Sequence, residues 1–132
     1  MKKMNKKGFT LIEMLAVIAI IAVLVSIVIP TVTSATEKAK EAADVANIRS
    51  AVASVTTEAL ANGGTPSQVV KMTQKTAGFV SADITSIGGI DGAPTTADTD
   101  CYKIAQAIVG KQVTIGWDST NNKVTVAVGN VG

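Results

Sequence analysis

Residues 1–30 read MKKMNKKGFTLIEMLAVIAIIAVLVSIVIP, and this stretch decides the fold. A basic leader is followed directly by 21 residues, 9–29, with only three polar interruptions. An α-helix of that length spans roughly 30 Å, which is the thickness of the hydrocarbon core of a bilayer. The stretch therefore predicts a membrane-spanning helix, with the leader lysines in the cytoplasm and the C-terminal body outside.

A cleaved secretory signal is the competing explanation of a basic leader before an apolar run. The apolar region of such a signal usually has about 7 to 15 residues and ends at small residues, which Thr33-Ser34-Ala35 imitates. The apolar run here is longer. Glu13 lies near its start, and an intramembrane charge costs roughly 2.5 to 3.5 kcal/mol on insertion scales. This charge indicates a partner or a specific task.

The N-terminal stretch resembles the class III signal of type IV prepilins and pseudopilins. The basic leader, the junction of Gly8 and Phe9, Glu13 four residues beyond it and Pro30 all occur in register. The resemblance covers residues 1 to about 40, and the rest of the chain is similar only in layout. It implies that prepilin peptidase cleaves after Gly8 and methylates the new amine of Phe9. Glycine suits this cut because an extended backbone without a side chain can approach an active site closely.

The resemblance also implies assembly into a filament. Glu13 of an incoming subunit would neutralise the Phe9 amine of a neighbour, and a buried pair of this kind sets register more than it adds stability. The alternative for Glu13 is a tolerated interfacial glutamate in an ordinary signal anchor. Pro30 lacks an N–H and predicts a kink or loosening of the helix, or alternatively a helix break at the membrane surface.

The partners implied by the resemblance are those of a polymerising membrane protein. They are prepilin peptidase, an assembly ATPase with its membrane platform protein, sister minor pilins, further copies of the chain, and membrane lipid before assembly. The chain would first be a single-pass membrane protein with its N-terminus in the cytoplasm, and afterwards part of an extracellular pilus. Adhesion, twitching motility and DNA uptake all stay open as uses of the filament.

The composition argues against catalysis and against nucleic-acid binding. The chain has no histidine and one cysteine, Cys101, so the usual metal sites and Cys-His nucleophiles are lacking, and neither an enzyme nor a cofactor is expected. Cys101 is expected to be a small buried residue. Without residues 1–8 the chain has 8 basic and 10 acidic residues, which does not favour binding to a phosphate backbone. An aromatic content of 3% argues against a base-stacking surface.

Two groups of polar residues near the C-terminus are candidates for calcium ligands. Asp98 and Asp100 form one group, and Asp118 with Asn121 and Asn122 forms the other. Hard oxygen ligands of this kind suit Ca²⁺, and some related pseudopilins bind it near their C-terminal loops. Asp and Asn are also ordinary turn residues. The prediction for metal is therefore none, with Asp98, Asp100 and Asp118 as the residues to watch.

Residues 31–61 continue the helix beyond the membrane, because they contain no Gly or Pro and many alanines. The charged part, residues 37–44, predicts a solvated face with a Lys40–Asp44 pair, or alternatively a contact with a partner. Residues 47–61 are less charged and are expected to pack beneath a small sheet. Apolar residues near helical spacing support the helix: Val32, Ala35, Ala39, Ala42, Ala46, Ala53 and Leu60.

The remaining residues predict a small mixed domain. Asn62-Gly63-Gly64 ends the long helix, and Thr65-Pro66-Ser67-Gln68 reads as a capping box that starts a second helix running to about Thr76. ITSIGGI, residues 84–90, reads as a short strand, and residues 99–109 as a third helix or, in KIAQAIV, a strand. Residues 112–117 and 123–128 alternate around DSTNN and predict a hairpin, with Trp117 as an anchor of the core.

These patterns together predict an α+β lollipop, a long N-terminal α-helix with a small head of antiparallel β-sheet and short helices. The expected division is a cleaved leader at 1–8, a membrane and filament-core helix at 9–29, an extracytoplasmic half at 30–61 and a head at 62–132. The favoured function is a major pilin. The alternatives are a pseudopilin of a type II secretion or competence machine, and a surface-anchored binding domain with an uncleaved signal anchor. The lone cysteine departs from the branch with a C-terminal disulfide loop, so no adhesion residues are transferred.

Overall fold

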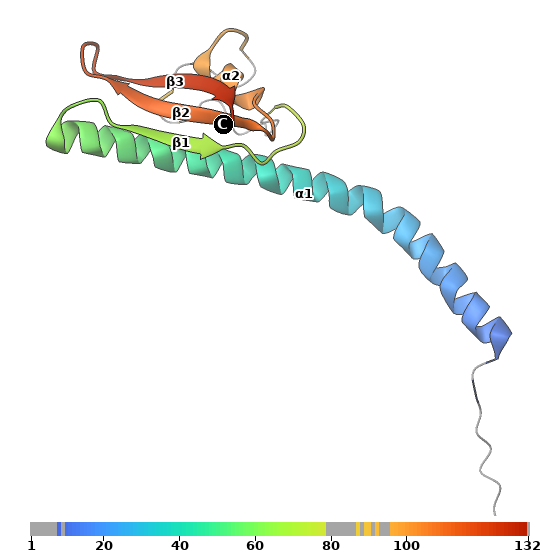
Figure 1. The fold of residues 1–132 in the computed structure, drawn as a ribbon. Helices are drawn as coiled ribbons and strands as arrows, with labels where there is room; N and C mark the ends of the chain where they lie inside the picture. Colours follow the sequence, from blue (N-terminus) through green and yellow to red (C-terminus); the bar gives the residue numbers. More distant parts are fainter. Residues whose placement is uncertain are drawn as a thin grey trace, which may run out of the picture. The chain divides into compact units, whose positions relative to one another are not determined.

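The computed structural model describes residues 8, 10–78, 87, 89, 90, 92 and 96–131. In chain order its elements are α1 (Leu11–Asn62), β1 (Ser67–Lys71), α2 (Asp100–Ala105), β2 (Lys111–Asp118) and β3 (Lys123–Asn130), as Figure 1 shows. The strands form one antiparallel sheet in the order β1-β2-β3. The predicted α+β class, a long N-terminal helix followed by a small antiparallel sheet and a short helix, is confirmed.

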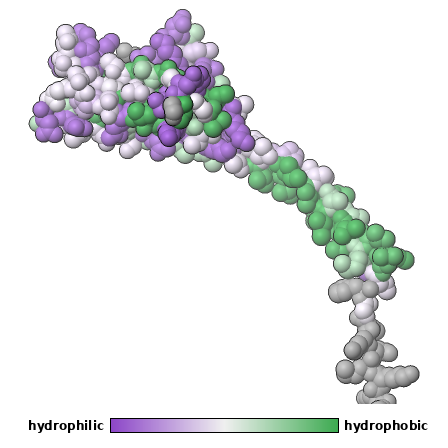
Figure 2. Space-filling model, viewed as in Figure 1, coloured by the Kyte–Doolittle hydropathy of each residue, from purple (hydrophilic) through white to green (hydrophobic). Residues whose placement is uncertain are grey.

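The chain consists of two compact units, residues 1–36 and residues 37–132, and α1 belongs to both. In the N-terminal unit the described side chains of α1 are exposed, and Figure 2 shows a hydrophobic surface over much of this part of the helix. The helix break considered at Pro30 is wrong, because α1 stays helical through this residue. Next to it the hydroxyls of Thr31 and Thr33 donate to the carbonyls of Val28 and Ile29, at 2.8 and 2.9 Å.

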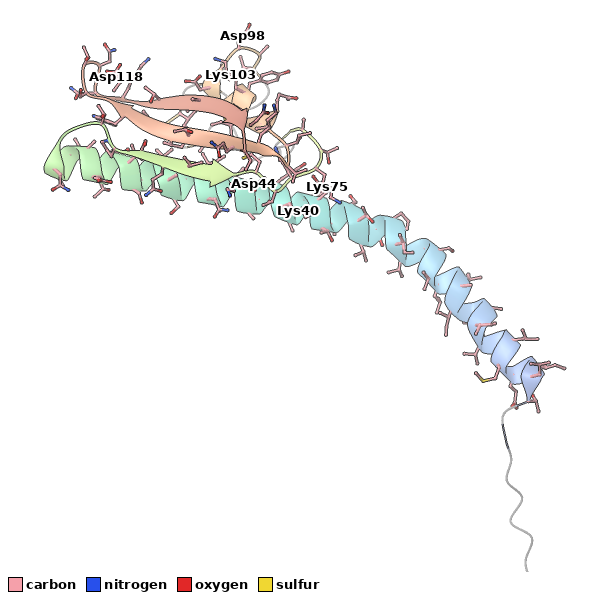
Figure 3. All side chains as sticks on the ribbon, in the orientation of Figure 1. Lys40, Asp44, Lys75, Asp98, Lys103 and Asp118 are labelled. Carbon is pink, nitrogen blue, oxygen red and sulfur yellow. The ribbon has the colours of Figure 1, made fainter. Side chains whose placement is uncertain are left out.

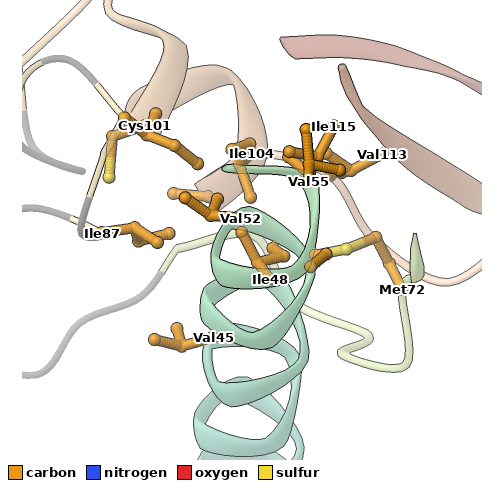
Figure 4. Close-up of a cluster of buried hydrophobic side chains, with 14 residues drawn as sticks. Val45, Ile48, Val52, Val55, Met72, Ile87, Cys101, Ile104, Val113 and Ile115 are labelled. Atoms are coloured by element: carbon orange, nitrogen blue, oxygen red, sulfur yellow. The ribbon is translucent and has the colours of Figure 1, made fainter. Parts of the chain in front are cut away.

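In the C-terminal unit one face of α1 forms the floor of the hydrophobic core. Ile48 and Val55 are completely buried, and they meet side chains from the sheet and from α2, as Figure 4 shows. The predicted packing of residues 47–61 beneath a sheet is confirmed. The apolar residues that suggested helical spacing, however, are all exposed and lie on roughly the opposite side of α1 from Ile48. The buried residues of α1 are Asp44, Val45, Ile48, Ala51, Val52, Val55 and Ala59.

The hairpin of β2 and β3 was correctly predicted. Trp117 pairs with Val124 and Asp118 with Lys123, so the strands are joined by residues 119–122. Val113 and Ile115 point into the core and are fully buried. Trp117 lies on the same face but is only half-buried and packs against the side of the core. Trp117 therefore contributes to the core from its edge and does not anchor it as predicted, because aliphatic side chains fill the centre.

The helix predicted to run from the capping box at residues 65–68 to Thr76 is wrong. Ser67–Lys71 form strand β1, which pairs with β2 from Ser67↔Gly116 to Lys71↔Gln112. Val69 and Val70 are β-branched and fit a pleated surface, so pairing with β2 overrides the local capping signal. The amides that follow the strand bond to α1 instead of bonding within a helix.

The helix predicted for residues 99–109 is confirmed, but it is shorter. Thr99 caps its N-terminus, where its hydroxyl accepts a hydrogen bond from the Tyr102 amide at 3.2 Å. The strand predicted for residues 84–90 falls mostly outside the described residues, and the described Ile87, Gly89 and Ile90 are not in a strand. Gly89 has a φ of +81°, and a Cβ there would lie 2.8 Å from Val52, so glycine lets this backbone approach α1.

Ile48→Ala should lower the free energy of unfolding of the C-terminal unit by about 2 to 5 kcal/mol, because the fully buried side chain leaves a cavity between α1 and the sheet. Leu60→Ala on the same helix removes a side chain that is 76% exposed. It should change the free energy of unfolding by no more than about 0.5 kcal/mol. Denaturant unfolding of the full chain in detergent micelles, followed by tryptophan fluorescence, measures both. Equal losses would contradict this description of the core.

Candidate processing and assembly site

The start of α1 is fixed by a reciprocal pair of hydrogen bonds. The Thr10 amide donates to Oε2 of Glu13 at 2.9 Å, and the Glu13 amide donates to the Thr10 hydroxyl at 3.2 Å. This is a capping box, which satisfies two of the amides that a helix leaves unpaired at its N-terminus. The spacing Thr10-x-x-Glu13 is readable in the sequence, and it is the signal by which this second role of Glu13 could have been found.

The predicted processing residues lie just before this cap. Gly8 is exposed, and no atom of the described part of the chain lies within 4 Å of the position that a Cβ would take there. Phe9, predicted to become the methylated N-terminus, lies outside the described residues. Because α1 begins at Leu11, Gly8 precedes the helix and is not part of it. The structure thus brings Glu13 and Thr10 together, and it places Pro30 far along the same helix.

The first part of α1 is long and apolar enough to cross a membrane, and none of the 18-residue window that qualifies is buried within the chain. It is the only such helix among the residues that the structure describes. A core helix of a water-soluble protein would bury such a surface, whereas this surface is left for lipid or for other chains. The helix begins at Leu11, inside the span predicted for residues 9–29.

The solvated face predicted for the charged part of α1, residues 37–44, is not what the structure shows. Asp44 is completely buried, and its carboxylate accepts hydrogen bonds from the Thr73 amide at 3.0 Å, the Thr73 hydroxyl at 2.6 Å and the Gln74 amide at 2.9 Å. The predicted Lys40–Asp44 pair is wrong, since the ion pair found among the described residues is Lys103–Asp100. We call residues 72–78, which Asp44 holds against α1, the strap.

Glu37 holds the next part of the strap. Its Oε1 accepts a hydrogen bond from the Thr76 amide at 2.8 Å and another from the Lys75 amide. Glu37 and Asp44 are seven residues apart and so lie on one face of the helix. Their carboxylates therefore bind four consecutive amides, those of residues 73–76. Figure 3 shows Asp44 and Lys75 where the strap meets α1.

The strap also connects α1 to the segment between α2 and β2. The side-chain amide of Gln74 donates to the carbonyls of Ala105 at 3.1 Å and Ala107 at 2.6 Å, and its backbone carbonyl accepts from Val109 at 2.7 Å. Gln74 is fully buried, and its Oε1 has no hydrogen-bond partner among the residues that the structure describes. No local pattern in the sequence marks this network, because its partners are about thirty residues apart.

Two of the calcium candidates, Asp100 and Asp118, bond to their own surroundings, and Asp98 has a positive φ of 68°. Asp118 accepts hydrogen bonds from the Thr120 amide at 2.9 Å and from the side chain of Asn121 at 2.6 Å, as a turn residue does. Asp100 pairs with Lys103 at 3.5 Å. Among the described residues no three His, Cys, Asp or Glu side chains form a group that could hold a metal ion. Cys101 is fully buried, as predicted, and burial raises the pKa of its thiol.

A comparison with protein families addresses the N-terminal segment directly. Residues 3–29 match the model described as the prokaryotic N-terminal methylation motif. The segment carries this methylation motif. The motif includes Gly8, Phe9 and Glu13, and it supports a type IV pilin or pseudopilin whose leader is removed by prepilin peptidase. No curated protein and no solved structure matches the chain.

Acid should release the strap from Glu37. The hydrogen bond from the Thr76 amide, ahead of the one from Lys75 and the charge of Lys40, holds the pKa of Glu37 below its ordinary value. Because the folded pKa is the lower one, the contact stabilises the fold above the ordinary glutamate value of about 4.3 and is lost as the pH falls through the folded value. In NMR spectra of the full chain in micelles, the Thr76 amide shift should follow that titration.

Glu37→Gln is the matched control, because it keeps an acceptor but cannot titrate. In this variant the Thr76 amide shift should be independent of pH in the same range, while Glu58→Gln at an exposed position on α1 should leave the wild-type titration intact. A Thr76 amide that titrates equally in wild type and Glu37→Gln would show that another group is responsible.

Proposed function

We propose that the chain is the structural subunit of an extracellular type IV pilus, and specifically a major pilin. The methylation motif on an uncovered apolar helix carries this proposal. A membrane stores the subunit, with the helix at residues 9–29 spanning it and the C-terminal unit outside. Prepilin peptidase cleaves after Gly8 and methylates Phe9, and an assembly ATPase with its platform protein then moves the subunit into the filament.

Glu13 has two successive roles in this proposal. In the precursor it caps α1 through Thr10. In the filament its charge pairs with the Phe9 amine of a neighbour and sets the axial register. Removing apolar side chains from lipid into a helix bundle brings little hydrophobic gain, so packing of small and β-branched residues together with this pair directs assembly.

A pseudopilin of a secretion or DNA-uptake machine would use the same N-terminal segment. The presence of Glu13 favours a subunit in the body of either filament over one at its tip. The exposed apolar surface of α1 also suits an uncleaved signal anchor that holds a binding domain at the surface. The state of the N-terminus and the place where the protein accumulates distinguish these functions.

Intact-mass and N-terminal analysis of material sheared from the cell surface tests the proposal. A major pilin predicts that this fraction is rich in a chain that begins at methylated Phe9. A processed chain that stays in the cell envelope would instead indicate a pseudopilin. A chain that begins at Met1 and occurs only in membranes would contradict pilus function and indicate the signal anchor.

Glu13→Ala should be cleaved after Gly8 but assemble poorly with wild-type subunits, because it loses both the cap and the charge. Glu13→Gln separates the two roles, since a glutamine oxygen can still accept from the Thr10 amide. If charge sets the register, the yield of sheared filament should fall in both variants. A wild-type yield from Glu13→Gln would show that capping alone is needed, and a wild-type yield from Glu13→Ala would contradict any role in assembly.

A further inference from the structure

Strand β1 runs beside the last turns of α1 (Figure 1), and residues of both elements line one open groove. The groove has a volume of about 530 Å³. Ala53 and Ala61 contribute small apolar groups to it, while Glu58, Asn62 and Gln68 contribute polar ones. All five residues are exposed, so the groove is accessible to a partner.

The polar groups of this groove suit a cation that carries several hydrogen-bond donors. Glu58 contributes a carboxylate, and no basic side chain of the described residues lines the groove. The hydroxyl of Thr57, which also lines it, donates to the carbonyl of Ala53 at 2.8 Å, so its oxygen is left as an acceptor. A guanidinium is a planar fork of N–H donors with no acceptor, and it pairs well with a carboxylate.

Arg49 supplies such a group on the same helix. It is the only arginine of the sequence, and its side chain is exposed. The ion pair found in the described part of the chain is Lys103–Asp100, so neither Arg49 nor Glu58 has a charged partner there. Glu58 follows Arg49 by nine residues, which is about two and a half turns, so the two side chains leave α1 on opposite sides. They therefore cannot meet within one chain.

A second copy of the chain can bring the two charges together. Because Arg49 and Glu58 lie on opposite sides of α1, each subunit would contact one neighbour through Arg49 and another through Glu58. A contact between two different surfaces repeats from chain to chain and does not close into a two-fold dimer. A neighbour with its helix parallel to the first would be shifted along the axis by about 13 Å, the rise of nine residues.

The side of α1 between the two charges carries small residues. Ala46, Ser50, Ala53 and Thr57 follow one another at intervals of three or four residues, so they share one face of the helix. All four are exposed. The distance between packed helices depends on the side chains at the contact, and small ones allow a close approach. A neighbouring helix can therefore come near enough for an arginine to reach the groove.

We propose that Arg49 of one subunit enters the groove of the next and pairs with Glu58. This inference rests on the proposed filament and adds a specific contact between the C-terminal units of neighbouring subunits. The occupant is a second copy because the groove carries the carboxylate, and the opposite side of the same helix carries the unpaired arginine. A lysine of the second copy is the competing occupant.

Charge reversal in the full chain tests the pair. Arg49→Glu and Glu58→Arg, each alone, should lower the yield of sheared filament about tenfold, because like charges would then face each other at every contact. The chain with both substitutions should recover the wild-type yield to within about twofold. Lys123→Glu, an exposed reversal away from the groove, should leave the yield unchanged. The amount of cleaved subunit in the membrane should be equal in all variants, which checks that each one folds.

Expression of the two failing variants together gives a second measurement. An Arg49→Glu subunit and a Glu58→Arg subunit satisfy each other at both of their contacts, so the mixture should form filaments that contain both in equal amounts by mass spectrometry. Wild-type yields from both single variants would overturn the proposal, as would failure of both the double variant and the mixture. Loss of filament in Glu58→Arg but not in Arg49→Glu would assign the groove to a lysine. Absence of wild-type protein from the sheared fraction would overturn the proposed filament itself.

Discussion

The C-terminal unit depends on one buried carboxylate. Asp44 has no contact with water, and three donors from Thr73 and Gln74 satisfy its oxygens. A buried polar side chain without such partners would be unfavourable, so these hydrogen bonds hold the strap against α1. Gln74 then fixes the carbonyls of Ala105 and Ala107, and this positions the connection from α2 into β2. The polar network thus specifies how sheet, strap and helix fit together, while the aliphatic core supplies most of the burial.

The same sequence patterns that define single elements predicted most of the fold. The apolar run and the alanine-rich continuation predicted α1, and Gly63 with a φ of +71° follows its last residue. Strict alternation predicted the hairpin of β2 and β3. At β1 the local sequence favoured a helix, and the segment is a strand because it pairs with β2. The strap could not be predicted, because the acceptors Glu37 and Asp44 lie between 29 and 39 residues before the amides that they bind.

The candidate site residues near the N-terminus were proposed from their spacing along the chain. Gly8, Phe9 and Glu13 follow from the distance between leader, junction and charge, and the methylation motif covers all three. The structure adds that the Glu13 carboxylate already accepts a hydrogen bond from the Thr10 amide within the single chain. The charges of residues 37–44 were harder to interpret, since a carboxylate that binds backbone amides has the same sequence as one that faces water.

The unpaired edge of strand β1 affects how closely spaced copies of the chain can associate. In the described part of the chain it pairs only with β2, so its other edge is open. Open edges invite sheet-to-sheet aggregation, which proteins limit with short strands, prolines and lysines. β1 has five residues, Pro66 precedes it and Lys71 ends it. A population confined to two dimensions at high density would therefore be discouraged from joining through the β1 edge of its sheet.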